Sequence, residues 1–126
     1  MIENAIYSLL QDTTINVYVS DRVYPLQIPQ NDSLPAITYQ RIYTDRIRAL
    51  NADTNMVMAR FQITIFSYNF FEMKNIFDAV RTKLQRYNGT VSSVVIDDIK
   101  IEDELDLKND DETYQCVVDI YITYRE

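Results

Sequence analysis

Two amino acids are missing from this chain, and two more are almost missing. Histidine and tryptophan do not occur, and the 126 residues include one cysteine, Cys116, and one glycine, Gly89. Without histidine there is no usual general base, no usual zinc ligand and no Ser-His or Cys-His pair. One cysteine excludes a disulfide framework, and one glycine excludes a phosphate-cradling loop and a dinucleotide fingerprint. We therefore expect no bound cofactor and no nucleotide-binding enzyme.

The remaining composition is that of an ordinary globular protein. Hydrophobic residues make up 47% of the chain and charged residues 25%, and this length corresponds to a single domain, which we assign to residues 1–126. No apolar run approaches the 18 residues of a membrane span, and the first residues lack the pattern of a signal peptide. We expect a protein made in a cytosol-like compartment, without a membrane partner.

Negative charge is concentrated in one segment. The net charge is −7, from 12 basic and 19 acidic residues, and residues 97–112 alone carry nine acids against two lysines. The rest of the chain is therefore balanced, with ten residues of each sign. Because no basic cluster is present, the sequence lacks the electrostatic footprint of a nucleic-acid-binding protein.

The first third of the chain predicts one helix and an extended connection. Apolar residues at helical spacing favour a short amphipathic helix over residues 2–11. Three prolines, at positions 25, 29 and 35, follow a stretch of β-branched residues. We expect this stretch to be extended rather than helical, with one short edge strand near residues 22–24.

The middle of the chain has the alternation of two long strands. Residues 36–48 are rich in Tyr, Ile and Thr, and residues 57–65 place apolar side chains at every second position. The polar segment ALNADTN, residues 49–55, lies between them. This pattern predicts a long antiparallel hairpin with a connecting loop too long for a tight turn.

A second helix and further strands complete the pattern. Asn69 and Glu72 have the spacing of a capping box, and apolar residues at helical spacing continue from there to Tyr87. Gly89 lies where a helix end favours a left-handed residue. Apolar residues within 91–101 predict one or two strand segments, and strict alternation over 114–124 predicts a final strand.

These elements define a fold class. The order of helix, connection, hairpin, helix and strands predicts an α+β protein of two layers. We expect an antiparallel or mixed sheet of about four to five strands, with two helices packed on one face and a long projecting hairpin. Exposed sheet edges are natural places for subunits to join.

Carboxylates are the only abundant catalytic groups. The acidic window lacks the Asp-x-Asp-x-Asp-Gly loop of a calcium site, so we expect a solvated acidic loop and no metal. Cys116 alternates with apolar neighbours, which indicates a buried small side chain rather than a nucleophile. Near the hairpin tip, two arginines and two acids favour an intersubunit ion-pair site slightly over a solvated tip. They are Asp45, Arg46, Arg48 and Asp53.

Several segments, taken in order, resemble the tail completion or tail terminator family of long-tailed bacteriophages and gene-transfer particles. They include MIENAIYSLLQD at the start, ARFQITIFS in the second strand of the hairpin and CVVDIYITYRE at the end. The most specific piece is DRVYP followed by LPAITYQ. Its matching positions are Asp21, Arg22, Tyr24, Pro25, Pro35 and Tyr39.

The resemblance implies a structural role without enzymatic activity. It implies a ring, six-fold in relatives, that caps the head-proximal end of the tail tube, stops its elongation and offers a docking face to the head connector. The partners would be further copies, the major tail tube protein and the connector, in the virion after assembly in the host cytoplasm. An alternative is a non-structural adaptor or chaperone, or another neck protein of the same particle.

DNA would pass through such a ring without specific binding. A negative channel wall repels phosphate, which gives the acidic window a hypothetical purpose. The channel-lining candidates are Glu102, Asp103, Glu104 and Asp106.

Overall fold

The computed structural model describes residues 1–30, 32–48 and 53–125, except for the side chains at 47, 48, 53 and 54. Nine elements follow one another within these described residues. They are α1 (Ile2–Leu10), α2 (Thr13–Val19), β1 (Val23–Pro25), β2 (Ala36–Arg48), β3 (Asp53–Ser67), α3 (Phe70–Leu84), β4 (Gly89–Val91), β5 (Val94–Lys108) and β6 (Tyr114–Arg125).

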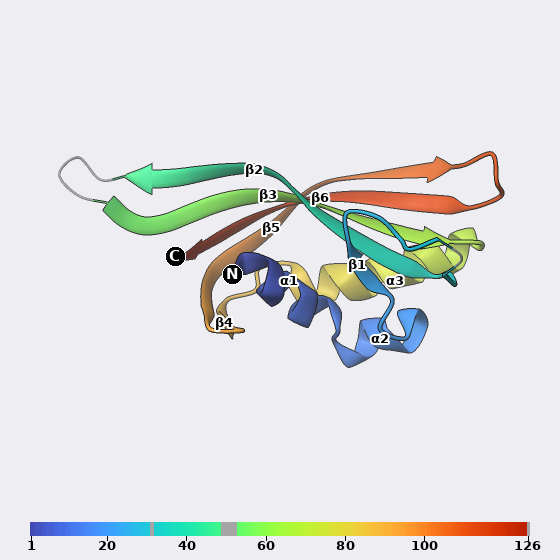
Figure 1. Cartoon of the computed structure of the whole chain (residues 1–126), viewed down its shortest axis with the longest axis horizontal. Coiled ribbons are helices and arrows are strands. Elements are labelled where there is room, and N and C mark those ends of the chain that lie inside the picture. The colour runs from blue at the N-terminus through green and yellow to red at the C-terminus, as the bar shows by residue number, and fades with distance from the viewer. Residues whose placement is uncertain (31, 49–52, 126) are drawn as a thin grey trace.

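The strands form one mixed sheet, and the helices cover one of its faces (Figure 1). The strand order is β1-β2-β3-β6-β5-β4, and every neighbouring pair is antiparallel except β1 with β2. The predicted α+β class is confirmed, but the described chain has three helices and six strands, more than the two and four to five expected. No described helix is long and apolar enough to cross a membrane.

The additional helix, α2, occupies the start of the segment that the sequence predicted to be extended. Asp12 caps it, because its carboxylate accepts hydrogen bonds from the backbone N–H and the hydroxyl of Thr14, at 3.2 and 2.5 Å. Ile15 and Val19 bury one face of the helix completely. The prediction of an extended chain was wrong here because the prolines, which exclude a helix, begin only at Pro25.

The start of α3 confirms the predicted capping box in a modified form. The Asn69 side chain accepts the backbone N–H of Glu72 at 3.0 Å. The Glu72 carboxylate accepts the hydroxyl of Ser67 at 2.7 Å, and that hydroxyl accepts the N–H of Asn69 at 3.0 Å. Ser67 therefore closes the reciprocal half of the box.

The end of α3 differs from the prediction. The helix ends at Leu84, and Arg86 rather than Gly89 takes the left-handed conformation, with φ of 62°. The N–H of Arg86 donates to the carbonyl of Ile99 at 2.7 Å, which ties the helix end to β5. Gly89 begins β4 at φ of 149°, where an added Cβ would lie 3.1 Å from the Tyr87 hydroxyl.

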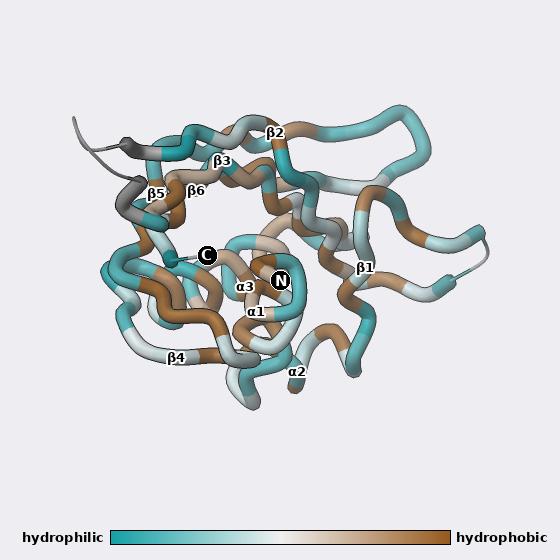
Figure 2. The backbone as a smooth tube through the Cα atoms, turned by 60° about the vertical axis from the view of Figure 1, so that its left-hand side comes forward, coloured by the Kyte–Doolittle hydropathy of each residue, from teal (hydrophilic) through white to brown (hydrophobic). Residues whose placement is uncertain are grey.

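The hydrophobic core lies between the two layers. Figure 2 shows hydrophobic residues in α1 and along the strands. On β3, Phe61, Ile63 and Ile65 are fully buried, and they face the equally buried Met73 and Ile76 of α3. The strict alternation that predicted these strands therefore marks the helix-covered face.

Two hairpins extend from this body in opposite directions (Figure 1). The β2–β3 hairpin is the projecting hairpin expected from the sequence, and its ladder continues to Arg48 opposite Asp53. Residues 53–55 are therefore strand rather than loop, and residues 49–52 lie outside the described residues. The β5–β6 hairpin extends in the other direction, with Lys108 opposite Tyr114 at its end.

Candidate functional site

Most of the acidic window is a strand, and only residues 109–112 form a turn as in the solvated loop that the sequence suggested. Its residues from Asp97 to Lys108 form most of β5, paired along their length with β6. Leu105 and Leu107 alternate with the acids and lie opposite Val117 and Gln115. Pairing with a strongly alternating neighbour, interrupted by two register shifts, is what holds this acidic segment in extended form.

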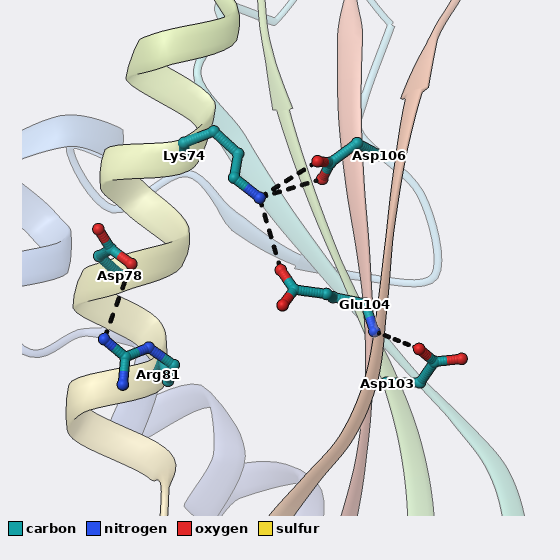
Figure 3. A network of polar contacts seen from close by, with 6 residues as sticks. All are labelled: Lys74, Asp78, Arg81, Asp103, Glu104 and Asp106. Carbon is teal, nitrogen blue, oxygen red and sulfur yellow. Dashed lines mark hydrogen bonds and ion pairs between the residues drawn. The ribbon is translucent and has the colours of Figure 1, made fainter.

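The alternation of β5 separates the four proposed channel-lining carboxylates. Glu104 and Asp106 lie opposite Val118 and Cys116, whose side chains are buried under the helices. Both carboxylates reach toward Lys74 of α3 (Figure 3). Because successive residues point to opposite faces, these two acids belong to the helix-covered face of the sheet.

The other two acids lie on the helix-free face. Asp103 pairs with Asp119 of β6, and Glu102 is the extra residue of a register shift between Ile101 and Asp103. Glu102 forms an ion pair with Lys100 at 3.1 Å on this face. The structure thus brings the predicted channel residues together in pairs, on two different faces.

Lys74 organises the acids of the covered face. Its ammonium lies 3.5 Å from a Glu104 carboxylate oxygen and 3.2 Å from one of Asp106. Although partial burial disfavours the charged form, the hydrogen bond that Lys74 donates to Asp106 raises the pKa of Lys74. The sequence reasoning missed this group, because α3 and β5 are distant along the chain.

Glu104, Asp106 and Cys116 have ligand atoms within 4.8 Å of one another, a spacing that would admit a metal ion. Burial raises the pKa of the Cys116 thiol to about 12, with a further contribution from its hydrogen bond to Asp106. A protonated thiol is a poor ligand, since metals bind the thiolate. Lys74 already supplies positive charge there, so these residues fit an internal ion pair better than a metal centre.

A charge pair lies near the middle of the helix-free face. The Arg60 guanidinium of β3 contacts the Asp119 carboxylate at 2.5 Å and lies 5.9 Å from the centre of the Tyr121 ring. The hydrogen bond that Arg60 donates to Asp119 raises the pKa of Arg60. Asp119 faces Asp103 across the ladder, so Arg60 offsets the repulsion between two like charges.

A groove of about 830 Å³ runs over this same face. Its lining residues come from β2, β3, β5 and β6. They are Ile42, Tyr43, Asp45, Met58, Arg60, Asp98, Lys100, Glu102, Tyr121 and Thr123. A sheet face with charged and aromatic side chains and no covering helix is suited to contact with another chain.

The predicted ion-pair site at the hairpin tip is divided as well. Asp45 lies opposite Met58 and lines the groove, whereas Arg46 lies opposite Val57 on the other face. Arg48 and Asp53 are opposite each other in the ladder, with their side chains outside the described part of the chain. The intersubunit role of the four residues stays a prediction.

An exposed aromatic group at the start of α3 was not predicted. Tyr68 and Phe71 are 66% and 76% exposed. The Phe70 ring packs edge-on against two other rings. Its centre lies 5.6 Å from that of Phe71 and 5.9 Å from that of Tyr114 in β6. The run Tyr-Asn-Phe-Phe at a helix start, outside the apolar stripe of the helix, is the signal that would have revealed it.

Comparison with known proteins adds the decisive observation. The family model described as tail completion protein gp17 matches residues 4–125. The chain belongs to this family. Membership in the tail completion family identifies it as a structural protein of a bacteriophage tail end.

A structural likeness agrees with the family fold. A chain in the structure described as the virion of a native gene transfer agent particle superimposes with a TM-score of 0.74. The match covers 97% of this chain and 92% of that one at 13% sequence identity, so what it shows is a shared fold. Among curated proteins, none matches.

Proposed function

We propose that this tail completion protein forms a ring at the head-proximal end of a tail tube. The ring stops tube elongation and provides the docking face for the head connector, without catalysis and without a cofactor. The observation that carries the proposal is the family match over residues 4–125. The likeness to a chain from a gene transfer agent virion supports a place in the finished particle.

The shape of the subunit supports a ring of several copies. A closed ring needs two different complementary surfaces on each subunit, unlike a two-fold dimer, which uses one surface twice. The β2–β3 and β5–β6 hairpins extend in opposite directions and differ in sequence and charge (Figure 1). Such a subunit has two unlike ends that can meet head to tail.

The helix-free face is the candidate for the channel wall. Asp98, Glu102, Asp103 and Asp119 lie on or beside it, against Lys100 and Arg60. This net negative charge repels phosphate as DNA passes. The original set of four channel residues is thereby reduced to Glu102 and Asp103, because Glu104 and Asp106 are on the other face.

Two matched amide variants test the channel assignment. Glu102→Gln with Asp103→Asn removes two charges from the helix-free face, and Glu104→Gln with Asp106→Asn removes two from the covered face. We expect only the first variant to slow DNA ejection, most clearly at low salt, where charges are least screened. Equal ejection rates for both variants at low salt would place the helix-free face outside the channel.

Counting the protein in purified particles tests the role itself. A ring component remains in the finished virion at a few copies, at the head-proximal end of the tail. Quantitative mass spectrometry and electron microscopy of labelled particles give the copy number and the position. Absence from purified virions, with normal abundance during assembly, would instead favour the non-structural adaptor.

A further inference from the structure

The sheet has two partly uncovered edges, on opposite borders. On one border β1 pairs only with Ile37–Tyr39 of β2. On the other, β4 pairs only with Val94–Ile96 of β5. Among the described residues, no strand pairs with the outer edge of β2 at residues 40–48 or with that of β5 at residues 102–108.

The outer edge of β5 is covered only in its first part. Beyond β4, the carbonyl of Ile99 accepts the N–H of Arg86, and the N–H of Ile101 donates to the Gln85 side chain at 2.9 Å. Further along, the N–H of Glu104 donates to the neighbouring Asp103 carboxylate at 2.8 Å. By the alternation of an antiparallel ladder, the N–H of residue 106 is also directed outward.

The outer edge of β2 has the same organisation. The N–H of Ile37 donates to the carbonyl of Arg22, and the carbonyl of Tyr39 accepts the N–H of Leu26, both at 2.9 Å. After the register shift between Arg41 and Tyr43, the ladder directs the backbone N–H and carbonyl of residue 44 toward the outer edge.

The two edges carry opposite charge. Residues 40–48 contain three arginines and one aspartate, a net charge of +2, and residues 102–108 contain four acids and one lysine, a net charge of −3. Charged edge strands resist pairing with copies of themselves. Edges of opposite sign accept each other, whereas β2 with β2 or β5 with β5 would bring like charges together.

We propose that neighbouring copies join by pairing the outer edge of β2 (residues 40–48) with the outer edge of β5 (residues 102–108) of the next copy. This inference rests on the proposed ring. Within one copy β2 and β5 run in opposite directions, since three antiparallel pairings connect them. Rotation about the ring axis preserves strand direction, so the pairing between copies is antiparallel and the sheet continues around the ring. Within one copy residue 44 lies level with residue 99, and residue 106 with residue 37, so the strands must be inclined to the ring axis, as in a sheared barrel, to bring the two edges together.

Cysteine pairs on the two edges test the contact directly. Native Cys116 lies opposite residue 106 and within hydrogen-bond reach of its side chain, so every chain in this experiment also carries Cys116→Ala. We would incorporate Thr44→Cys and Asp106→Cys chains together into tails and treat the purified tails with a short bis-maleimide, which tolerates an offset of a few residues in register. The expected product joins one chain of each kind, at twice the 14.9 kDa mass of the subunit.

The single variants and the double variant complete this experiment. Tails that contain only Thr44→Cys, or only Asp106→Cys, should give no covalent pair, and the chain with both cysteines should give a ladder of multimers. If the tails contain both variants but no Thr44→Cys chain is joined to an Asp106→Cys chain, the edge pairing is overturned and the ring proposal still stands. Covalent pairs from one single variant alone would show a two-fold contact and overturn it as well.

Proline substitution provides an independent test. Asp106→Pro removes the outward N–H and blocks strand addition, whereas Asp106→Ala loses the same carboxylate and keeps the N–H. We expect at least a tenfold loss of Asp106→Pro from purified tails relative to Asp106→Ala, with both subunits folded by circular dichroism. Equal incorporation of the two variants would contradict the proposal. Absence of the wild-type chain itself from tails would contradict the proposed function and the edge pairing with it.

Discussion

The two faces of the sheet differ in the side chains that they carry and in whether helices cover those side chains. On the covered face, apolar side chains of β3 and β6 are fully buried against the helices, with Phe61 and Ile120 among them. On the other face, Arg60, Asp119 and Tyr121 lie in a groove or beside it, and none of the described helices covers them. The first face accounts for the folding free energy, since that energy comes chiefly from buried apolar area.

The contrast indicates that side chains on the helix-free face can be changed without unfolding the protein. The polar side chains on the helix-free face form only some of the hydrogen bonds that they could make with one another. Within the described chain, Nε of Arg60 and Oδ1 of Asp119 are buried atoms without a hydrogen-bond partner. Unsatisfied buried polar atoms are costly, so a neighbouring copy or an ordered water that reaches them would stabilise the assembled state.

The largest expected effect is in the covered layer. Phe77 is 5% exposed on α3, and Phe77→Ala should lower the free energy of unfolding by about 3–5 kcal/mol, because truncation leaves a cavity. Phe71 is the matched control on the same helix, and Phe71→Ala should cost less than about 0.5 kcal/mol. Urea unfolding measures both, and equal losses would show that the two sides of α3 are not distinct.

A smaller effect is expected on the helix-free face. Arg60→Met leaves Asp119 opposite Asp103 without its neutralising partner, so the urea midpoint should fall, by less than for Phe77→Ala. Adding Asp119→Val to the same chain removes the orphaned charge and should recover part of the loss. If the double variant is less stable than Arg60→Met alone, the pair does not act as described.

The smallest of these effects concerns the cap of α2. Asp12→Ala should cost about 1 kcal/mol, whereas Asp12→Asn keeps a capping oxygen and should cost much less. The hydrogen bond from Thr14 lowers the pKa of Asp12 in the folded protein. Its contribution is therefore complete above pH about 4 and is lost as the pH falls through the lowered pKa. The difference in unfolding free energy between the wild type and Asp12→Asn, measured from pH 2 to pH 7, should show this dependence, because the other carboxylates titrate alike in both chains.

Much of the fold could be predicted because its signals are local. Alternation located β2, β3 and β6, and the spacing of Asn69 and Glu72 located the start of α3. The short helix α2 was missed because β-branched residues weaken a helical pattern, and here burial of Ile15 and Val19 overrides their propensity.

The candidate surfaces could be predicted only in part. The sequence located the acidic segment, but a one-residue register shift at Glu102 decides which acids share a face. The contact of Lys74 with Asp106 joins residues 32 positions apart, and no local pattern indicates such a pair. The two open edges likewise depend on the order of strands across the sheet.

The length of tails assembled without this protein tests the central claim most directly. A protein that ends the tube and forms its docking face should leave, when removed, tails of irregular or excessive length that fail to join filled heads. Electron microscopy of particles from a strain that lacks the protein gives the distribution of tail lengths, and supplying the wild-type chain should restore a single length. Tails of normal length on infectious particles in its absence would contradict the account.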